Sequence, residues 1–181
     1  MIEVVTGKIG SGKTIYAVER IVQKIASGGT VVTNIDFIWP EVEKFVIKKF
    51  SVYPDESQLV YLDINNHANW DDVIPWGVPG SHILAVWDEV QLFFNSRDWK
   101  NTQDNHSRLL SFLTQSRKAC VDVIFITQVS STMDKQMRVQ AQFEHYIVNS
   151  SQISLGPLGS FPKFCNFYIR HTKDMESKQV V

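Results

Sequence analysis

The stretch that decides the fold is VVTGKIGSGKTIY, residues 4–16. A run that begins with β-branched residues leads into a glycine-rich turn, which ends in a lysine and a threonine before apolar residues recur at helical spacing. The turn fits the pattern G-x-x-x-x-G-K-[ST] with Gly7, Gly12, Lys13 and Thr14. A strand, such a turn and a helix in succession predict a phosphate-binding loop.

Each fixed residue of this loop has a physical reason to be there. Glycines let backbone N–H groups close around a β-phosphate, Lys13 can reach the β- and γ-phosphate oxygens, and Thr14 can place its hydroxyl on Mg²⁺. We expect ATP and Mg²⁺ as cofactors, with ATP favoured over GTP because the sequence has no NKxD motif. The alternative is a glycine-rich turn with a solvated lysine. The expected nucleotide contacts are Gly7, Lys8, Ile9, Gly10, Ser11, Gly12, Lys13, Thr14 and Ile15.

A second pattern supplies the acidic groups that nucleotide hydrolysis requires. Residues 82–90, HILAVWDEV, are a nearly continuous apolar run that ends in two acids, as in a central strand buried on both faces. Asp88 is the expected metal ligand and Glu89 the group that activates the attacking water. The same two acids could instead cap a following helix.

A polar residue also ends the apolar run IFITQ, residues 124–128. Gln128 could donate to a γ-phosphate oxygen or hold the attacking water, with Thr127 a weaker candidate. A glutamine at the end of a strand could also be an ordinary turn residue.

An arginine from a neighbouring subunit often neutralises charge on the transferred phosphate. Arg117 and Arg138 are the candidates for this role, and Arg97 and Arg108 are weaker ones. The alternative for each of them is a solvated surface position.

Composition favours an ordinary soluble domain. The chain has 181 residues, of which 44% are hydrophobic and 20% charged. No segment approaches the roughly 18 consecutive apolar residues of a membrane span, and the start lacks the layout of a secretory signal. We expect one P-loop ATPase domain over residues 1–171, a loose polar tail at 172–181, and a location in the host cytoplasm, with any membrane or virion association made through partners. Cys120 and Cys165 form no CxxC pair, so buried apolar packing is their expected role.

Charge is unevenly distributed along a chain whose net charge is −1. Residues 51–90 carry seven acids and no lysine or arginine. A broad basic face for nucleic acid is therefore not expected, and any DNA contact should be local or formed by an oligomer. The aromatic, basic and amide-rich stretch at 93–105 is the candidate for such a contact.

Hydrophobic periodicity predicts an α/β domain with a mainly parallel sheet. Residues 65–81, rich in proline and glycine, are expected to form a long loop, and no helix is predicted between residues 35 and 80. The expected strands are 2–6, 30–34, 58–63, 82–90, 121–128, 143–149 and 164–171, and the expected helices are 13–26, 106–119 and a short one near 134–139.

Four segments together resemble a known family. They are VVTGKIGSGKT (4–14), TVVTNI (30–35), VWDEVQLFF (86–94) and SFLTQSRKACVDVIFITQ (111–128). Over residues 1–150 the chain resembles the N-terminal ATPase domain of zonula occludens toxin (Zot)-like proteins, the assembly ATPases of filamentous phages. These belong to the FtsK/HerA group of DNA-pumping ATPases, together with viral packaging ATPases.

The resemblance implies a three-layer P-loop NTPase of the additional-strand, RecA-like type. It places the sensor strand between the phosphate-loop strand and the Asp-Glu strand. It also implies a homo-oligomer, a hexameric ring that moves phage or viral DNA with capsid or membrane assembly proteins as partners. Such proteins usually continue into a transmembrane helix and a periplasmic portion, which this sequence lacks. Whether it is part of a longer protein of this kind or a soluble packaging ATPase stays open, and so does the choice between extrusion and genome packaging. Many members also carry HRH where this chain has SRK (116–118), which weakens any family role for Arg117.

Two other functions compete with a DNA motor. A P-loop kinase for a small molecule would suit the length, but the Asp-Glu strand and the Gln-ended strand suit attack by water better. A nucleotide-binding assembly scaffold that hydrolyses little ATP is the third hypothesis.

Overall fold

The computed structural model describes residues 1–62, 74–92, 103–150 and 168–175. The loop expected at 65–81 and the stretch proposed for DNA contact at 93–105 fall largely outside these residues. In the described part of the chain, no helix combines the length and apolar character needed to cross a bilayer.

The described strands form a sheet of seven in the order β3-β2-β4-β5-β1-β6-β7. All neighbours are parallel except β6 and β7, which pair antiparallel at one edge. The sensor strand β5 lies between the phosphate-loop strand β1 and the Asp-Glu strand β4, which confirms the order that the family resemblance implies. The strands are β1 (Ile2–Thr6), β2 (Val31–Thr33), β3 (Leu59–Tyr61), β4 (Ile83–Trp87), β5 (Val121–Ile126), β6 (Phe143–Asn149) and β7 (Tyr168–Asp174).

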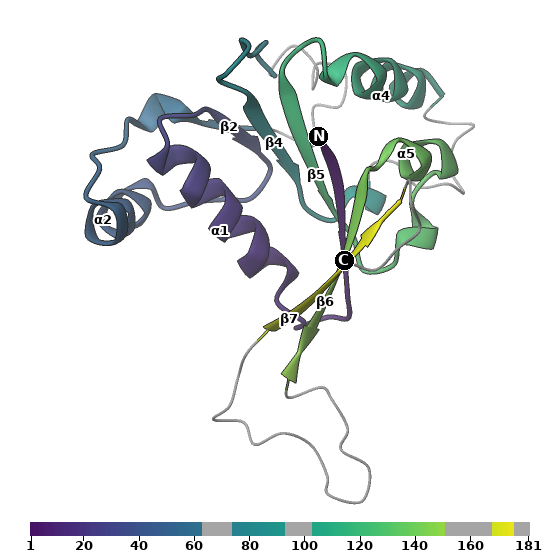
Figure 1. Cartoon of the computed structure of the whole chain (residues 1–181), viewed down its shortest axis with the longest axis horizontal. Helices are drawn as coiled ribbons and strands as arrows, with labels where there is room; N and C mark the ends of the chain where they lie inside the picture. Colours follow the sequence, from purple (N-terminus) through teal and green to yellow (C-terminus); the bar gives the residue numbers. More distant parts are fainter. Residues whose placement is uncertain (63–73, 93–102, 151–167, 176–181) are drawn as a thin grey trace, which may run out of the picture.

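Helices cover both faces of this sheet (Figure 1). They are α1 (Lys13–Ala26), α2 (Trp39–Phe50), α4 (Gln103–Ser116) and α5 (Lys135–Gln140). Short 3-10 turns occur at η1 (Glu56–Gln58), η3 (Val90–Leu92) and η4 (Ser130–Thr132). The expected three-layer α/β architecture is therefore present.

The central strands are largely buried because both of their faces are covered. Every residue of β1 and of β4 is buried. Val5 packs in one core cluster with Ile21 of α1, whereas its neighbour Val4 packs in the other cluster with Met137 of α5. This alternation divides the core into two layers, one on each side of the sheet.

Helix α1 has the predicted bounds because its apolar residues fall on one stripe. Ala17, Ile21, Val22 and Ile25 are buried against the sheet. The helix ends at Ser27 and Gly28, where Gly28 has a positive φ of 78°. The glycine stop expected after the helix is confirmed.

Helix α2 was not expected. It begins after Ile38 with Pro40 in its first turn, and it buries Val42 and Val46 in the α1 layer. The i, i+4 spacing of these two valines was the available signal, but two apolar positions are too few to predict a helix reliably.

The loose tail expected from residue 172 is wrong at its start. Strand β7 continues to Asp174, and its Thr172 and Asp174 lie opposite His145 and Phe143 of β6. The expected domain boundary at 171 therefore falls inside a strand, because pairing with β6 satisfies the backbone of this polar segment.

Other predicted boundaries differ by a few residues. β4 ends at Trp87 rather than at residue 90, and α4 spans Gln103–Ser116 rather than 106–119. Cys120 is a buried free thiol, as expected, and Cys165 lies outside the described residues.

Candidate nucleotide-binding site

The phosphate-binding loop lies where β1 ends and α1 begins. Gly7, Gly10 and Gly12 have positive φ angles of 150°, 73° and 97°. A Cβ atom at Gly7 would lie only 2.4 Å from the carbonyl oxygen of Ile147, so no larger residue fits there without a shift. The glycines that the motif requires are thus required by the backbone as well.

Lys13 crosses the inside of this loop. Its Nζ donates to the carbonyl oxygens of Gly7 at 2.9 Å and Lys8 at 3.1 Å, and the side chain is buried. The ammonium group is therefore held beside the turn whose N–H groups would receive a phosphate.

Other loop residues fit a phosphate as well. Ser11 is buried, and its Oγ has no hydrogen-bond partner among the described residues. A buried hydroxyl without a partner costs free energy, and a phosphate oxygen would satisfy it. The remaining predicted contacts, Lys8, Ile9, Gly10, Thr14 and Ile15, are exposed on the same turn or at the start of α1.

The acidic end of β4 meets the start of α1. Thr14 Oγ1 donates to Asp88 Oδ2 at 3.1 Å, so the structure brings the two predicted metal ligands together. A hydroxyl and a carboxylate are oxygen ligands of the type that Mg²⁺ prefers. The described residues contain no cluster of three His, Cys, Asp or Glu that could hold a metal ion. An ion at this pair would therefore need phosphate oxygens or water to complete its shell.

Burial governs the charge of Asp88. Burial raises the pKa of this carboxyl above its ordinary value, and the neighbouring Glu89 carboxylate acts in the same direction. Hydrogen bonds from the Glu89 N–H and from Thr14 oppose the rise, as does the positive charge of Lys13. A divalent cation would favour the charged form instead.

Asn34 fixes the backbone of Asp88. Its Nδ2 donates to the Asp88 carbonyl oxygen at 2.9 Å, and its Oδ1 accepts from the Asp88 N–H at 2.7 Å. Asn34 follows β2, so it reaches Asp88 from the neighbouring strand. The sequence prediction gave Asn34 no role, although its position just after a buried strand was a usable signal.

Glu89 takes an unusual backbone conformation. Its φ is 51°, which is costly for a residue with a side chain and recurs at functional sites. The Glu89 carboxylate accepts a hydrogen bond from the amide of Gln91. The Asp88 carboxylate accepts from the adjacent Glu89 N–H, not from N–H groups two or three residues further on as a helix cap does.

Gln128 lies next to the loop through its backbone. Its carbonyl oxygen accepts from the Gly7 N–H at 3.4 Å, and its side chain is exposed. Thr127 is buried, and its hydroxyl donates to the Val129 carbonyl oxygen at 3.4 Å. The structure thus brings Gln128 near the loop, and its sensor role stays a prediction.

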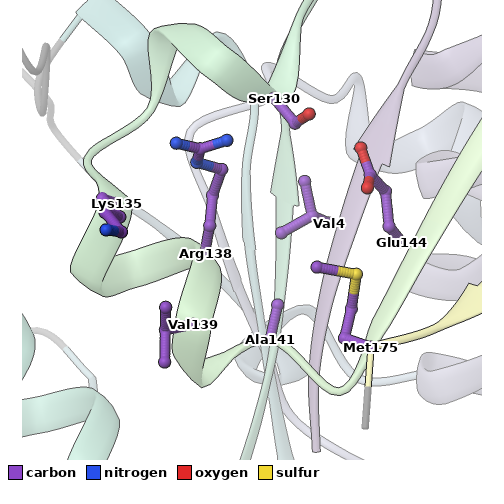
Figure 2. Close-up of a pocket in the computed structure, with 8 residues that line it drawn as sticks. All are labelled: Val4, Ser130, Lys135, Arg138, Val139, Ala141, Glu144 and Met175. Carbon is purple, nitrogen blue, oxygen red and sulfur yellow. The ribbon is translucent and has the colours of Figure 1, made fainter. Parts of the chain in front are cut away.

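The two arginine candidates do not reach the loop of their own chain. Arg117 is exposed just after α4, near the amino end of β5, whereas the loop follows the carboxyl end of β1. Arg138 lies on α5 beside a cavity of about 240 Å³, and its Nε is buried without a partner among the described residues. Figure 2 shows this side chain extending toward Ser130, with Glu144 on the β6 side of the cavity. The role of either arginine in a neighbouring subunit stays a prediction.

A buried charged network that no sequence pattern predicted lies on the β6 side of β1. Glu3 is 2% exposed, and its carboxylate accepts from Arg20 at 3.0 Å and from the Tyr16 hydroxyl at 3.2 Å. His145 Nε2 lies 3.1 Å from the same carboxylate, and its Nδ1 lies 3.0 Å from the Thr172 hydroxyl. The network links β1, β6 and β7 to the first two turns of α1.

Known proteins share both sequence and fold with this chain. The gene 1 protein of Escherichia phage If1 is 35% identical over 150 residues, which cover 80% of this chain and 40% of the relative. The chain thus spans less than half the length of such relatives.

Two solved structures have a similar fold. The genome packaging NTPase B204 from Sulfolobus turreted icosahedral virus 2, in complex with AMP, gives a TM-score of 0.63 at 14% identity, over 99% of this chain and 95% of B204. The N-terminal domain of zonular occludens toxin from Neisseria meningitidis gives 0.50 at 20% identity, over 97% and 95%. The family model for zonular occludens toxin (Zot) matches residues 1–165. The chain therefore belongs to the Zot family.

Proposed function

We propose that the chain is the ATPase part of a motor that couples ATP hydrolysis to the movement of phage or viral DNA in virion assembly. The observation that carries the proposal is the hydrogen bond of 3.1 Å from Thr14 to Asp88. It joins the phosphate-binding loop to an acidic strand end, which is the arrangement that NTP hydrolysis requires.

Each side chain of the site has one task in this proposal. Lys13 and the N–H groups of the loop bind the β- and γ-phosphates, and Thr14 and Asp88 hold Mg²⁺. When bound, Mg²⁺ neutralises charge that develops on the phosphate oxygens. Glu89 accepts the proton of the attacking water, and Gln128 holds that water or the γ-phosphate.

The assembly supplies what the single chain lacks. Neither Arg117 nor Arg138 reaches its own loop, so one of them acts from a neighbouring subunit of a homo-oligomer, which we propose to be a hexameric ring. The relatives are phage proteins, and B204 is described as a genome packaging NTPase, which supports DNA as the load. Capsid or membrane assembly proteins in the host cytoplasm are the proposed partners, and both extrusion and packaging fit the site.

Replacement of Glu89 tests this function. We expect Glu89→Gln to lower ATP turnover by about 10²- to 10³-fold, with ATP binding retained, because only the proton acceptor is lost. The matched control is Glu41→Gln on the exposed surface of α2, which should leave turnover unchanged.

Other outcomes would favour the other functions. Equal turnover with and without Glu89 would indicate an assembly scaffold. Phosphate transfer that strictly requires an added acceptor would indicate a kinase. A motor should release phosphate without an acceptor and should do so faster when DNA is added.

A further inference from the structure

The phosphate-binding loop has two different sides. The sheet order places β4 on one side of β1 and β6 with β7 on the other. The hydrogen bond from Thr14 to Asp88 joins the two predicted metal ligands, so the metal ion and the γ-phosphate of a bound triphosphate are expected on the β4 side. This leaves the β6 and β7 side of the loop for the nucleoside end of the same triphosphate.

A cavity of about 410 Å³ opens on that second side. We call it the hairpin cavity, because α1 forms one wall and the β6-β7 hairpin the other. Its volume falls within the roughly 300–1,000 Å³ of typical small-molecule sites. Gly12 of the loop is one of its lining residues, so the cavity borders the phosphate-binding loop. Figure 1 shows the start of α1 and the first residues of β7 at the same end of the sheet.

An aromatic ring lies where this cavity meets the loop. Tyr168, the first residue of β7, packs so closely on Gly12 that a Cβ atom there would lie 2.3 Å from its ring carbon Cδ1. The Tyr168 side chain is nevertheless 44% exposed, so part of its surface faces outward beside the loop. A flat, partly exposed ring next to a phosphate site is suited to stacking on a nucleobase.

The rest of the cavity is lined by both apolar and polar side chains, and contacts between α1 and β7 hold its two walls together. Ile15, in the first turn of α1, is 56% exposed and adds an apolar surface to the cavity wall. The Arg170 NH1 donates to the Tyr16 hydroxyl at 3.3 Å, and its guanidinium lies 5.5 Å from the Tyr16 ring centre. These contacts hold β7 against α1 and keep Tyr168 at the loop.

We propose that the hairpin cavity receives the nucleoside of the bound nucleotide and that Tyr168 stacks on its base. The proposal rests on the proposed function in that it takes the loop to bind a nucleoside triphosphate. It assigns a base contact that the sequence did not reveal, because Tyr168 is remote in sequence from the phosphate motif.

Two ligands distinguish contacts to the nucleoside from contacts to the phosphates. The affinities of the full chain for AMPPCP and for inorganic tripolyphosphate, both with Mg²⁺, are measured by calorimetry. We expect Tyr168→Ala to weaken AMPPCP binding by about tenfold and to leave tripolyphosphate binding unchanged, because only the nucleoside contacts the ring. Tyr168→Phe should bind both ligands as the unaltered chain does.

The controls decide what a negative result means. Tyr53→Ala, at a tyrosine that is 82% exposed outside the cavity, should change neither affinity. If Tyr168→Ala lowered the affinity for both ligands equally, or left the affinity for AMPPCP unchanged, the base contact would be overturned. If the unaltered chain bound neither ligand, the proposed function would fail, and the base contact with it.

Discussion

On the β4 side of the phosphate-binding loop, the hydrogen bond from Thr14 to Asp88 joins α1 to the sheet, and both groups remain open to a ligand. On the β6-β7 side, Glu3 accepts hydrogen bonds from Arg20 and Tyr16 and contacts His145, with almost no exposure to solvent. The first side therefore has a hydroxyl and a carboxylate that can bind a metal ion. The second side satisfies its own charges, so its charge network supports the loop, while the charges of the first side change when a metal ion and phosphates bind.

The largest effect that tests this comparison should come from Glu3→Ala. The substitution removes the carboxylate and leaves His145 and Arg20 without their partner, so we expect the free energy of unfolding to fall by about 3–5 kcal/mol. Chemical denaturation measures this loss.

A matched pair of surface charges provides its control. Glu41 accepts from Lys44 at 2.8 Å on exposed α2, and Glu41→Ala should cost less than about 1 kcal/mol. A loss of under about 1 kcal/mol in Glu3→Ala as well would contradict a supporting role for the β6-β7 side.

A smaller effect is expected from Asn34→Ala on the β4 side. Asn34 makes two hydrogen bonds to the backbone of Asp88, and their loss should lower the free energy of unfolding by about 1–3 kcal/mol. ATP turnover should also fall, by about tenfold, because a misplaced Asp88 misplaces the metal and Glu89.

The measurement compares turnover with binding. In Asn34→Ala, tripolyphosphate affinity without Mg²⁺ should stay close to that of the unaltered chain, because the loop itself is intact. Lys13→Ala serves as the control that lowers this affinity directly. Unchanged turnover in Asn34→Ala would show that the clamp on Asp88 has no catalytic effect.

The two sides also differ in how well the sequence predicts them. Strand β1, helix α1 and strand β6 have the predicted bounds, and Asp88 and Thr14 meet as expected, because local motifs and apolar periodicity determine these features. Local patterns carry no information about a partner far along the chain. Glu3 and His145 could therefore not be paired from the sequence.

Edge elements were the hardest to predict for a related reason. Strand β7 ends in Lys173 and Asp174, two residue types that are depleted in strands, and pairing with β6 makes them part of one. Helix α2 buries little more than Val42 and Val46, so its periodic signal is short. In both cases tertiary contacts outweigh local preference.

The pH dependence of stability should show the smallest effect, with opposite signs on the two sides. Burial alone would raise the pKa of Glu3, but the hydrogen bond from His145 and the charges of Arg20 and His145 hold it below the ordinary value of 4.5. The Glu3 carboxylate therefore binds a proton more readily in the unfolded chain than in the folded chain. The stability that Glu3 contributes is fully present above about pH 4.5 and is lost as the pH falls through the folded pKa.

Asp88 should behave in the opposite way. Burial holds its folded pKa above the ordinary 3.8, so stability falls as the pH rises from that value through the folded pKa. The free energy of unfolding is measured by denaturation across acidic pH. Glu3→Gln should abolish the rise of this free energy with pH that Glu3 causes, and Asp88→Asn should abolish the fall that Asp88 causes. Mg²⁺ with tripolyphosphate should also abolish this fall in the unaltered chain, because a bound cation favours the Asp88 carboxylate. If both substitutions changed the profile in the same direction, the division into a supporting side and a ligand-dependent side would not hold.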